Sequence, residues 1–272
     1  HGVKIAAYAD DLKFYSCDST AIQSALDDLD LWCKDWQMVL APEKCRVIHF
    51  GSFTPPIFFL NGIPIPAVGN EGIRDLGFII RPDLSFAAHV AMIAAKAKSK
   101  ISFIFRAIKL RNVDTLCTAY NTYVLPLLES GSPVFNSIEK RDVNLLESCQ
   151  RYFTRRLFKR CGLKKLTAVD RAAFLDLPQL QGRRLVADLC LVHARQHNRL
   201  ICESIPILRP THQYPTSRHL KILPQLGVSK LRSATLLNRI ATHWNKLPAD
   251  VIGLRAKAFR AHCEDLFMNF QE

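Results

Sequence analysis

The chain has 272 residues, 49% of them hydrophobic, and a net charge of +13 at pH 7. A chain of this length and apolar content can bury a core, which excludes a disordered protein. It has no apolar run of membrane-spanning length and no signal-peptide pattern, so we expect no membrane association, and nine cysteines without a CxxC pair indicate reduced thiols inside a cell. The first residue is His1 rather than methionine, and we expect the sequence to be a fragment.

The first predicted element is a β-hairpin at the start of the chain. Val3–Ala7 and Leu12–Tyr15 are short, β-prone runs. Asp10 and Asp11 stand between them, at or beside the predicted turn. Adjacent carboxylates at a tight turn are common ligands of a divalent cation, but aspartate is also a good turn residue without any metal, so the pair by itself leaves both interpretations open.

A helix is predicted after the hairpin, with Asp18 as its N-cap. Its apolar residues recur at helical spacing: Ile22, Ala25, Leu26, Leu29, Trp32, Cys33 and Trp36. We expect the two tryptophans to belong to the core rather than to stack on nucleic-acid bases. Pro42 marks the end of this region.

Three β-like runs follow, RVIHF, IFFL and GFII, each bounded by glycine or proline, and a turn is predicted at Asn61-Gly62. They predict a small β layer. From Pro82 onward the apolar period lengthens to that of a helix, and Lys96 and Lys100 lie off the apolar stripe. The stripe consists of Val90, Ile93, Ala94, Ala97, Ile101, Ile104, Phe105 and Ile108. Further helices are predicted over 114–129, 139–160, 182–202 and 233–246.

Several motifs together resemble a known family. YADD, LDDLDLWCKDWQMVLAPEKCRVIHFG, LNGIPI and RDLGFIIRPDLSFAAHV are similar, in order and spacing, to the reverse transcriptases of non-LTR (LINE-type, jockey-like) retrotransposons. The resemblance continues through LLESGSPVF, CQRYFTRRLF and LPQLQGRRLVADL to RSATLLNRIATHWNKLPADV. It therefore extends over nearly the whole chain.

This resemblance implies an α+β fold with three parts. Residues 1–82 would be a partial polymerase palm of β-hairpins plus a helix, with the YADD hairpin and a segment like the primer grip. Residues 83–165 would form a mostly helical thumb, and residues 166–272 a basic helical C-terminal extension. The activity implied is that of an RNA-directed DNA polymerase, which adds deoxynucleotides to a primer 3′-hydroxyl.

The site residues are carried over from the family one by one. Asp10 would be a ligand of Mg²⁺ (or Mn²⁺), and Asp11 its neighbour near the primer terminus. Tyr8 would lie under the primer end, where it packs rather than reacts. Lys44 resembles the palm lysine that neutralises pyrophosphate, although a solvated lysine after Pro-Glu is an equal alternative. Leu76 and Gly77 would lie in the primer grip.

Two departures weaken the implied activity. Ala41 replaces the family's usual asparagine before the EKC segment, and the sequence contains no upstream fingers or first palm motifs. We therefore expect the isolated chain to be inactive without those upstream fingers, palm and endonuclease domains. The partners implied are an RNA template, a DNA primer and deoxynucleoside triphosphates, in the cytoplasm and nucleus. A non-catalytic nucleic-acid-binding relic and a helical protein-interaction module remain alternatives.

The net positive charge of the chain comes entirely from its second half. Residues 1–136 contain 13 basic and 13 acidic side chains, whereas residues 137–272 contain 24 and 11. This asymmetry favours a polyanionic partner over a merely solvated basic surface. In the predicted helix from residue 139, an apolar stripe leaves a basic face for phosphates, and the four first candidates are Arg155, Arg156, Lys159 and Arg160.

Four Cys and His residues have the spacing C-x2-H-x3-H-x4-C. Cys190, His193, His197 and Cys202 have residue types that bind zinc. The first three share a helical face but stand in the apolar run LVADLCLVHARQH, which core packing explains better. We therefore expect no zinc.

Overall fold

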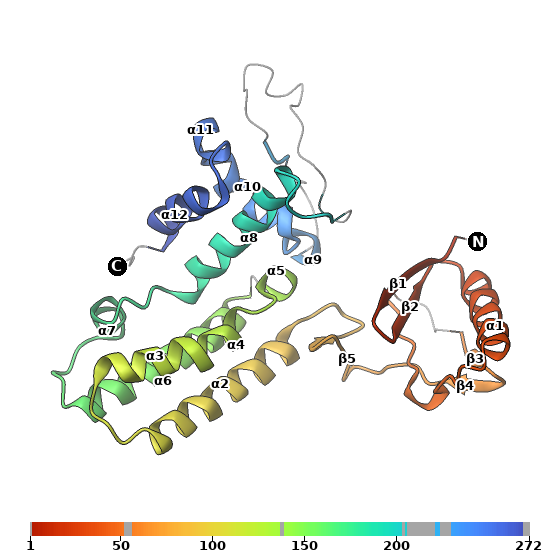
Figure 1. The fold of residues 1–272 in the computed structure, drawn as a ribbon, viewed down its shortest axis with the longest axis horizontal. Helices are drawn as coiled ribbons and strands as arrows, with labels where there is room; N and C mark the ends of the chain where they lie inside the picture. The colour runs from red at the N-terminus through yellow and green to blue at the C-terminus, as the bar shows by residue number, and fades with distance from the viewer. Residues whose placement is uncertain are drawn as a thin grey trace. The chain divides into compact units, whose positions relative to one another are not determined.

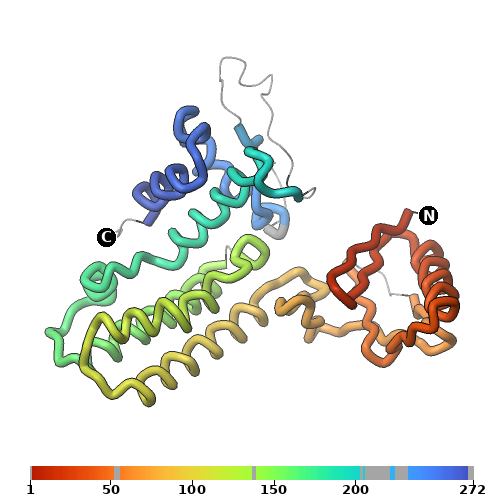
Figure 2. The backbone as a smooth tube through the Cα atoms, in the orientation of Figure 1, coloured from red at the N-terminus to blue at the C-terminus, as the bar shows by residue number. Residues whose placement is uncertain are grey.

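The computed structural model describes residues 2–51, 56–136, 139–202, 205, 221–223 and 230–268, with 230 and 231 as backbone only. The chain divides into two compact units, His1–Phe86 and Ala87–Glu272, which are drawn in Figures 1 and 2. The described strands all lie in the first unit, and every described helix from α2 onward lies in the second. The predicted α+β class is confirmed, while the names palm and thumb stay predictions.

The first unit begins with the predicted hairpin. Strands β1 (Lys4–Tyr8) and β2 (Asp11–Tyr15) pair antiparallel, with Tyr8 opposite Asp11. The two-residue turn between them is Ala9-Asp10, and Ala9 has a φ of 52°, which side-chain-bearing residues seldom adopt. The predicted hairpin is therefore confirmed, and its turn is placed on the YADD motif itself.

Helix α1 (Ser19–Asp35) follows, and Asp18 is its N-cap as predicted, because its carboxylate accepts a hydrogen bond from the Thr20 amide at 2.9 Å. The prediction that the tryptophans belong to the core is wrong: Trp32 is 48% exposed and Trp36 68%. The helix buries only Leu26 and Cys33, because the core of this unit is small.

The predicted β layer is replaced by separate two-stranded sheets. Strands β3 (Phe58–Leu60) and β4 (Ile63–Ile65) form one hairpin, and β5 (Ile73–Asp75) and β6 (Phe78–Ile80) form another. The turn at Asn61-Gly62 is confirmed, with both φ angles positive at 51° and 73°. The RVIHF run, after the 3₁₀ turn η1 (Pro42–Lys44), forms only an isolated bridge from Val47 to Ala67. Prolines on either side of Ile65 cannot donate to a longer ladder.

The second unit is helical. Its elements are α2 (Ala87–Ala107), α3 (Val113–Tyr123), α4 (Leu125–Glu129), α5 (Ser132–Phe135), α6 (Lys140–Cys161), α7 (Ala168–Phe174), α8 (Leu180–Gln196), α9 (Lys230–Ser233), α10 (Leu236–Lys246), α11 (Ala249–Ile252) and α12 (Ala256–Phe267). The sequence predicted α2, α3 with α4, α6, α8 and α10, and it missed α5, α7, α9, α11 and α12. None of the helices within the described residues combines the length and apolar character needed to cross a bilayer.

Helices α2, α3 and α6 pack against one another (Figure 1). Their shared core includes Tyr120 stacked on Phe153 with ring centres 4.2 Å apart, and Phe105 at 5.9 Å from Phe153. Contacts between α2 and α6 advance together along both helices, from Ala94 with Cys149 to Phe105 with Arg160. The two helices therefore run in the same direction.

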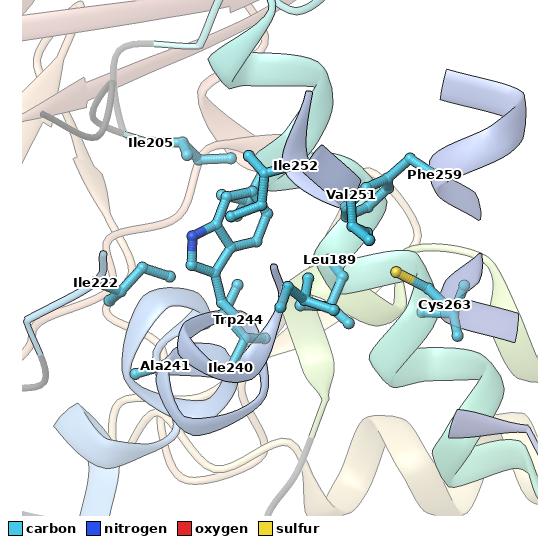
Figure 3. Close-up of a cluster of buried hydrophobic side chains, with 13 residues drawn as sticks. Leu189, Ile205, Ile222, Ile240, Ala241, Trp244, Val251, Ile252, Phe259 and Cys263 are labelled. Carbon is cyan, nitrogen blue, oxygen red and sulfur yellow. The ribbon is translucent and has the colours of Figure 1, made fainter. Parts of the chain in front are cut away.

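A second core joins α8 to the last helices (Figure 3). Trp244 of α10 is fully buried there, together with Leu189 of α8 and Phe259 of α12. Helix α12 lies along α8. Gly182 of α8 allows the C-terminal end of α12 to come close, because a Cβ atom at residue 182 would collide with the Phe267 carbonyl oxygen. Glycine at residue 182 is thus a packing requirement.

Candidate functional site

The YADD hairpin presents two solvated carboxylates. Asp10, in the turn, and Asp11, at the start of β2, are both exposed, and Tyr8 beside them is 65% exposed. Within the described parts of the chain, neither carboxylate has a hydrogen bond or an ion pair. Exposed carboxylates with free oxygens suit a hard cation such as Mg²⁺. No group of three or more His, Cys, Asp or Glu residues that could hold a metal occurs among the described residues, so the pair is at most part of a metal site.

An ion pair ties this hairpin to the β5–β6 hairpin. Lys13 Nζ on β2 lies 2.7 Å from Asp75 Oδ1 on β5. Asp75 immediately precedes Leu76-Gly77, the turn that the family resemblance places in the primer grip. Leu76 is 47% exposed with a φ of 44°, and Gly77 has a φ of 91° with open space where a Cβ would stand. The glycine is needed here for its backbone angle rather than for a close neighbour.

Lys44 ends the η1 turn and is exposed. No hydrogen bond or ion pair joins it to Asp10 or Asp11 among the described residues. Its assignment to pyrophosphate therefore stays a prediction.

Helices α2 and α6 form a basic pair. Residues 84–113, which contain α2, include six Lys or Arg and no acidic residue, and residues 148–169, in and after α6, include seven and none. Lys96 and Lys100 are exposed on α2, as expected from their place off the apolar stripe. Lys100 Nζ lies 6.0 Å from the ring centre of Phe103, which is itself 57% exposed. An exposed aromatic ring among cations is a feature of single-stranded nucleic-acid sites.

The four basic candidates on α6 have different environments. Arg155 and Lys159 are exposed, whereas Arg156 and Arg160 are only partly exposed. Arg160 donates to the Ile108 carbonyl at 2.9 Å and to the Phe105 carbonyl at 2.8 Å, and so it caps the C-terminal end of α2. The Arg160 guanidinium therefore stabilises the packing of α6 against α2, while Arg155 and Lys159 remain exposed to solvent.

Arg156 takes part in a polar cluster between the two helices. Its Nη1 donates to Tyr152 Oη at 2.8 Å and to Ser102 Oγ at 3.1 Å, and the two hydroxyls lie 3.1 Å apart. Its guanidinium carbon lies 4.7 Å from the ring centre of Phe105. The hydrogen bond with Ser102, together with the nearby Arg156, lowers the pKa of Tyr152. This cluster holds Arg156 in place with neutral groups only.

Ser102, Tyr152 and Arg151 were not predicted from the sequence. Arg151 is exposed one helical turn before Arg155, so the same spacing that selected Arg155 and Lys159 would have included it. Ser102 and Tyr152 had no sequence signal, since their role depends on how α2 packs against α6.

The two histidines of the Cys190–Cys202 motif contact one backbone carbonyl oxygen. His193 Nε2 lies 3.1 Å and His197 Nε2 2.9 Å from the same Ile252 carbonyl oxygen at the end of α11. His193 Nδ1 accepts from Arg199 at 2.7 Å, which assigns its proton to Nε2, and its ring stacks on Phe259 at 3.8 Å. Burial, and then the neighbouring His197, lower the pKa of His193 to about 4. Both rings are thus engaged in packing α8 against the last helices.

Two curated proteins resemble parts of the chain. An uncharacterized protein of Caenorhabditis elegans is 30% identical over 121 residues, which cover 44% of this chain and 61% of the relative. The RNA-directed DNA polymerase from mobile element jockey of Drosophila melanogaster is 27% identical over 166 residues, which cover 57% of this chain and 18% of the polymerase. The chain thus spans less than two thirds of either relative.

No family model matches the chain, and no solved structure matches it. The similarity to the jockey polymerase supports a distant relationship to the reverse transcriptases of non-LTR retrotransposons.

Proposed function

We propose that this chain is the C-terminal part of a non-LTR retrotransposon reverse transcriptase, which adds deoxynucleotides to a primer 3′-hydroxyl on an RNA template. The similarity to the jockey polymerase is the observation that carries the proposal. The exposed Asp10-Asp11 pair at a hairpin turn supports it, because nucleotidyl transfer needs carboxylates that can reach a metal ion and a primer end.

Asp10 and Asp11 would hold Mg²⁺, which when bound promotes ionisation of the primer hydroxyl and neutralises the pyrophosphate that leaves. The two-residue turn keeps Asp10 out of the strand ladder and places Asp11 in its last pair. The Lys13–Asp75 ion pair would keep the Leu76-Gly77 turn at a fixed place relative to these carboxylates. In the reaction, this chain would therefore supply two metal-binding carboxylates and position the primer.

The basic pair of α2 and α6 would hold the nucleic acid. The 13 cations of residues 84–113 and 148–169 would attract phosphates and release their counterions. The exposed candidates are Lys96, Lys100, Arg151, Arg155 and Lys159.

The polymerase proposal is tested by fusing the fingers and first palm motifs of a related element upstream of residue 1. The fusion should extend a primer on an RNA template, and Asp10→Ala should abolish extension. Asp28→Ala is the matched control, since Asp28 is an exposed carboxylate on α1. Full extension by the Asp10→Ala fusion would contradict the role given to Asp10.

A second candidate function is nucleic-acid binding without catalysis. The observation in its favour is that residues 84–113 and 148–169 contain 13 Lys or Arg and no acidic residue, while the carboxylate pair has no third metal ligand among the described residues. The isolated chain should then bind oligonucleotides without extending a primer. Template-dependent extension by the isolated chain would show instead that the metal site is complete.

A further inference from the structure

Arg156 and Arg160 lie one turn apart on α6 and differ in how many of their guanidinium nitrogens are hydrogen-bonded. Arg160 uses both terminal nitrogens on backbone carbonyls of α2 and its C-terminal end. Arg156 uses only Nη1, which it shares between Ser102 and Tyr152. Its Nε and Nη2 have no hydrogen-bond partner among the described residues, and both atoms are accessible to solvent.

The unpaired edge of Arg156 is the one that binds oxyanions. In arginine, Nε–H and Nη2–H point in parallel and match two oxygens of a phosphate or carboxylate. Arg239 uses the same edge on Asp188, with distances of 2.7 and 2.9 Å. No described carboxylate forms an ion pair with Arg156, so its charge is not neutralised within the described chain.

The surroundings of Arg156 reduce the entropy cost of binding. Two hydroxyls and the Phe105 ring already fix the guanidinium, and a side chain that is held in place loses less rotamer freedom when it binds a ligand. The pair of hydroxyls carries no negative charge that would compete with an anion. Exposed Arg155 on the same helix adds positive charge next to this position.

We propose that Arg156, positioned by Ser102 and Tyr152, binds one backbone phosphate of a nucleic acid at the junction of α2 and α6. This inference rests on the proposed nucleic-acid function and adds to it a specific phosphate contact. Ser102 and Tyr152 are positioning residues, and Arg160 has a purely structural role.

The experiment compares Arg156→Gln with Arg160→Gln in the 272-residue chain. The binding of a fluorescent single-stranded oligonucleotide is measured by anisotropy over a range of salt concentrations. Arg156→Gln should weaken binding about tenfold and reduce the salt slope by about 0.7, the value for one lost phosphate contact, with a fall in melting temperature no larger than that of Arg160→Gln. Arg160→Gln removes the same charge but should lower the melting temperature and leave the salt slope unchanged.

The hydroxyl of Ser102 is tested by a conservative rescue. Ser102→Ala should weaken binding at an unchanged melting temperature, and Ser102→Thr should restore it, which a simple loss of helix packing would not produce. If the wild-type chain bound no oligonucleotide, the nucleic-acid proposal and this contact would both fall. If the wild type bound and the two arginine variants had equal salt slopes, only the phosphate contact would be wrong.

Discussion

Asp188 on α8 and Arg239 on α10 form a two-point ion pair in the core, although they are far apart in sequence. Asn136 adds a hydrogen bond to the same carboxylate at 3.0 Å. Asp188 is fully buried, so water cannot replace Arg239 as its partner. Arg184, one turn earlier on α8, is also buried, and its pKa is lowered to about 10 by burial, with Asp188 acting in the opposite direction.

Asp188→Asn should strongly destabilise the second unit, because it removes the charge that pairs with Arg239 and that favours the charged form of buried Arg184. Breaking a buried pair in this way costs about 3–5 kcal/mol in the free energy of unfolding. The measurement is urea unfolding followed by circular dichroism. Asp250→Asn, at an exposed position on α11, is the matched control and should change little. Equal effects of the two variants would show that the ion pair adds no stability.

The free energy of unfolding should fall as the pH drops from about 6.5 to 4. His193 has a pKa of about 4 in the folded chain against an ordinary value of 6.5, so the unfolded chain binds its proton first. The contribution is complete above pH 6.5, and on the order of 3 kcal/mol is lost by pH 4. Burial also lowers the pKa of His89 and His243, which act in the same direction.

Urea unfolding of wild type and His193→Gln at several pH values isolates the His193 contribution. The variant should be less stable at pH 7, since the Ile252 carbonyl loses a donor, but its stability should depend less on pH. Parallel curves for the two proteins between pH 4 and 6.5 would contradict the assignment of a neutral ring.

Gly182→Ala should destabilise the packing of α12 on α8. The added methyl group would overlap the Phe267 carbonyl oxygen, which is backbone and cannot rotate away. A cost of about 1–3 kcal/mol is typical of such overpacking. The control is Gly253→Ala, whose Cβ would make ordinary contacts at 3.5 Å with a φ of −76° at the residue. If thermal unfolding gave the same melting temperature for both variants, the close approach of the two helices would be wrong.

Purified chain should contain no stoichiometric zinc, because the rings of His193 and His197 both face a carbonyl oxygen. Elemental analysis measures the metal content directly. A chelator such as EDTA should leave the melting temperature unchanged. One zinc ion per chain, lost in a Cys190→Ala variant, would contradict this prediction.

Local signals in the sequence were sufficient for much of the first unit. Asn61-Gly62 predicted its hairpin because both residues tolerate a positive φ, and Asp18 predicted a helix start because its carboxylate can bond the first amides. The exposure of Trp32 could not be predicted in this way. Periodicity identifies which side of a helix is apolar, but not how much of that side its neighbours cover.

The contacts of the second unit depend on pairs that are distant in sequence. Arg156 and Arg160 look equivalent in the sequence, and only the packing of α2 against α6 gives Arg160 the carbonyls of Phe105 and Ile108. In the same way, the spacing of His193 and His197 fits a metal as well as it fits a carbonyl from a distant helix. The place of Asp10 and Asp11 at a hairpin turn was predicted because the strands that form it are adjacent in sequence.

The common direction of α2 and α6 also affects how the basic pair attracts a polyanion. Parallel helices bring their C-terminal ends together, and each end carries a partial negative charge of about half an electron from its aligned peptide dipoles. Lys109, Arg111 and Lys164 follow these two ends, so part of their charge compensates the dipoles. The middle of the helices has no such compensation. The attraction for phosphates should therefore be strongest around Lys100 and Arg155, rather than at the end of the pair where lysine and arginine are most crowded in sequence.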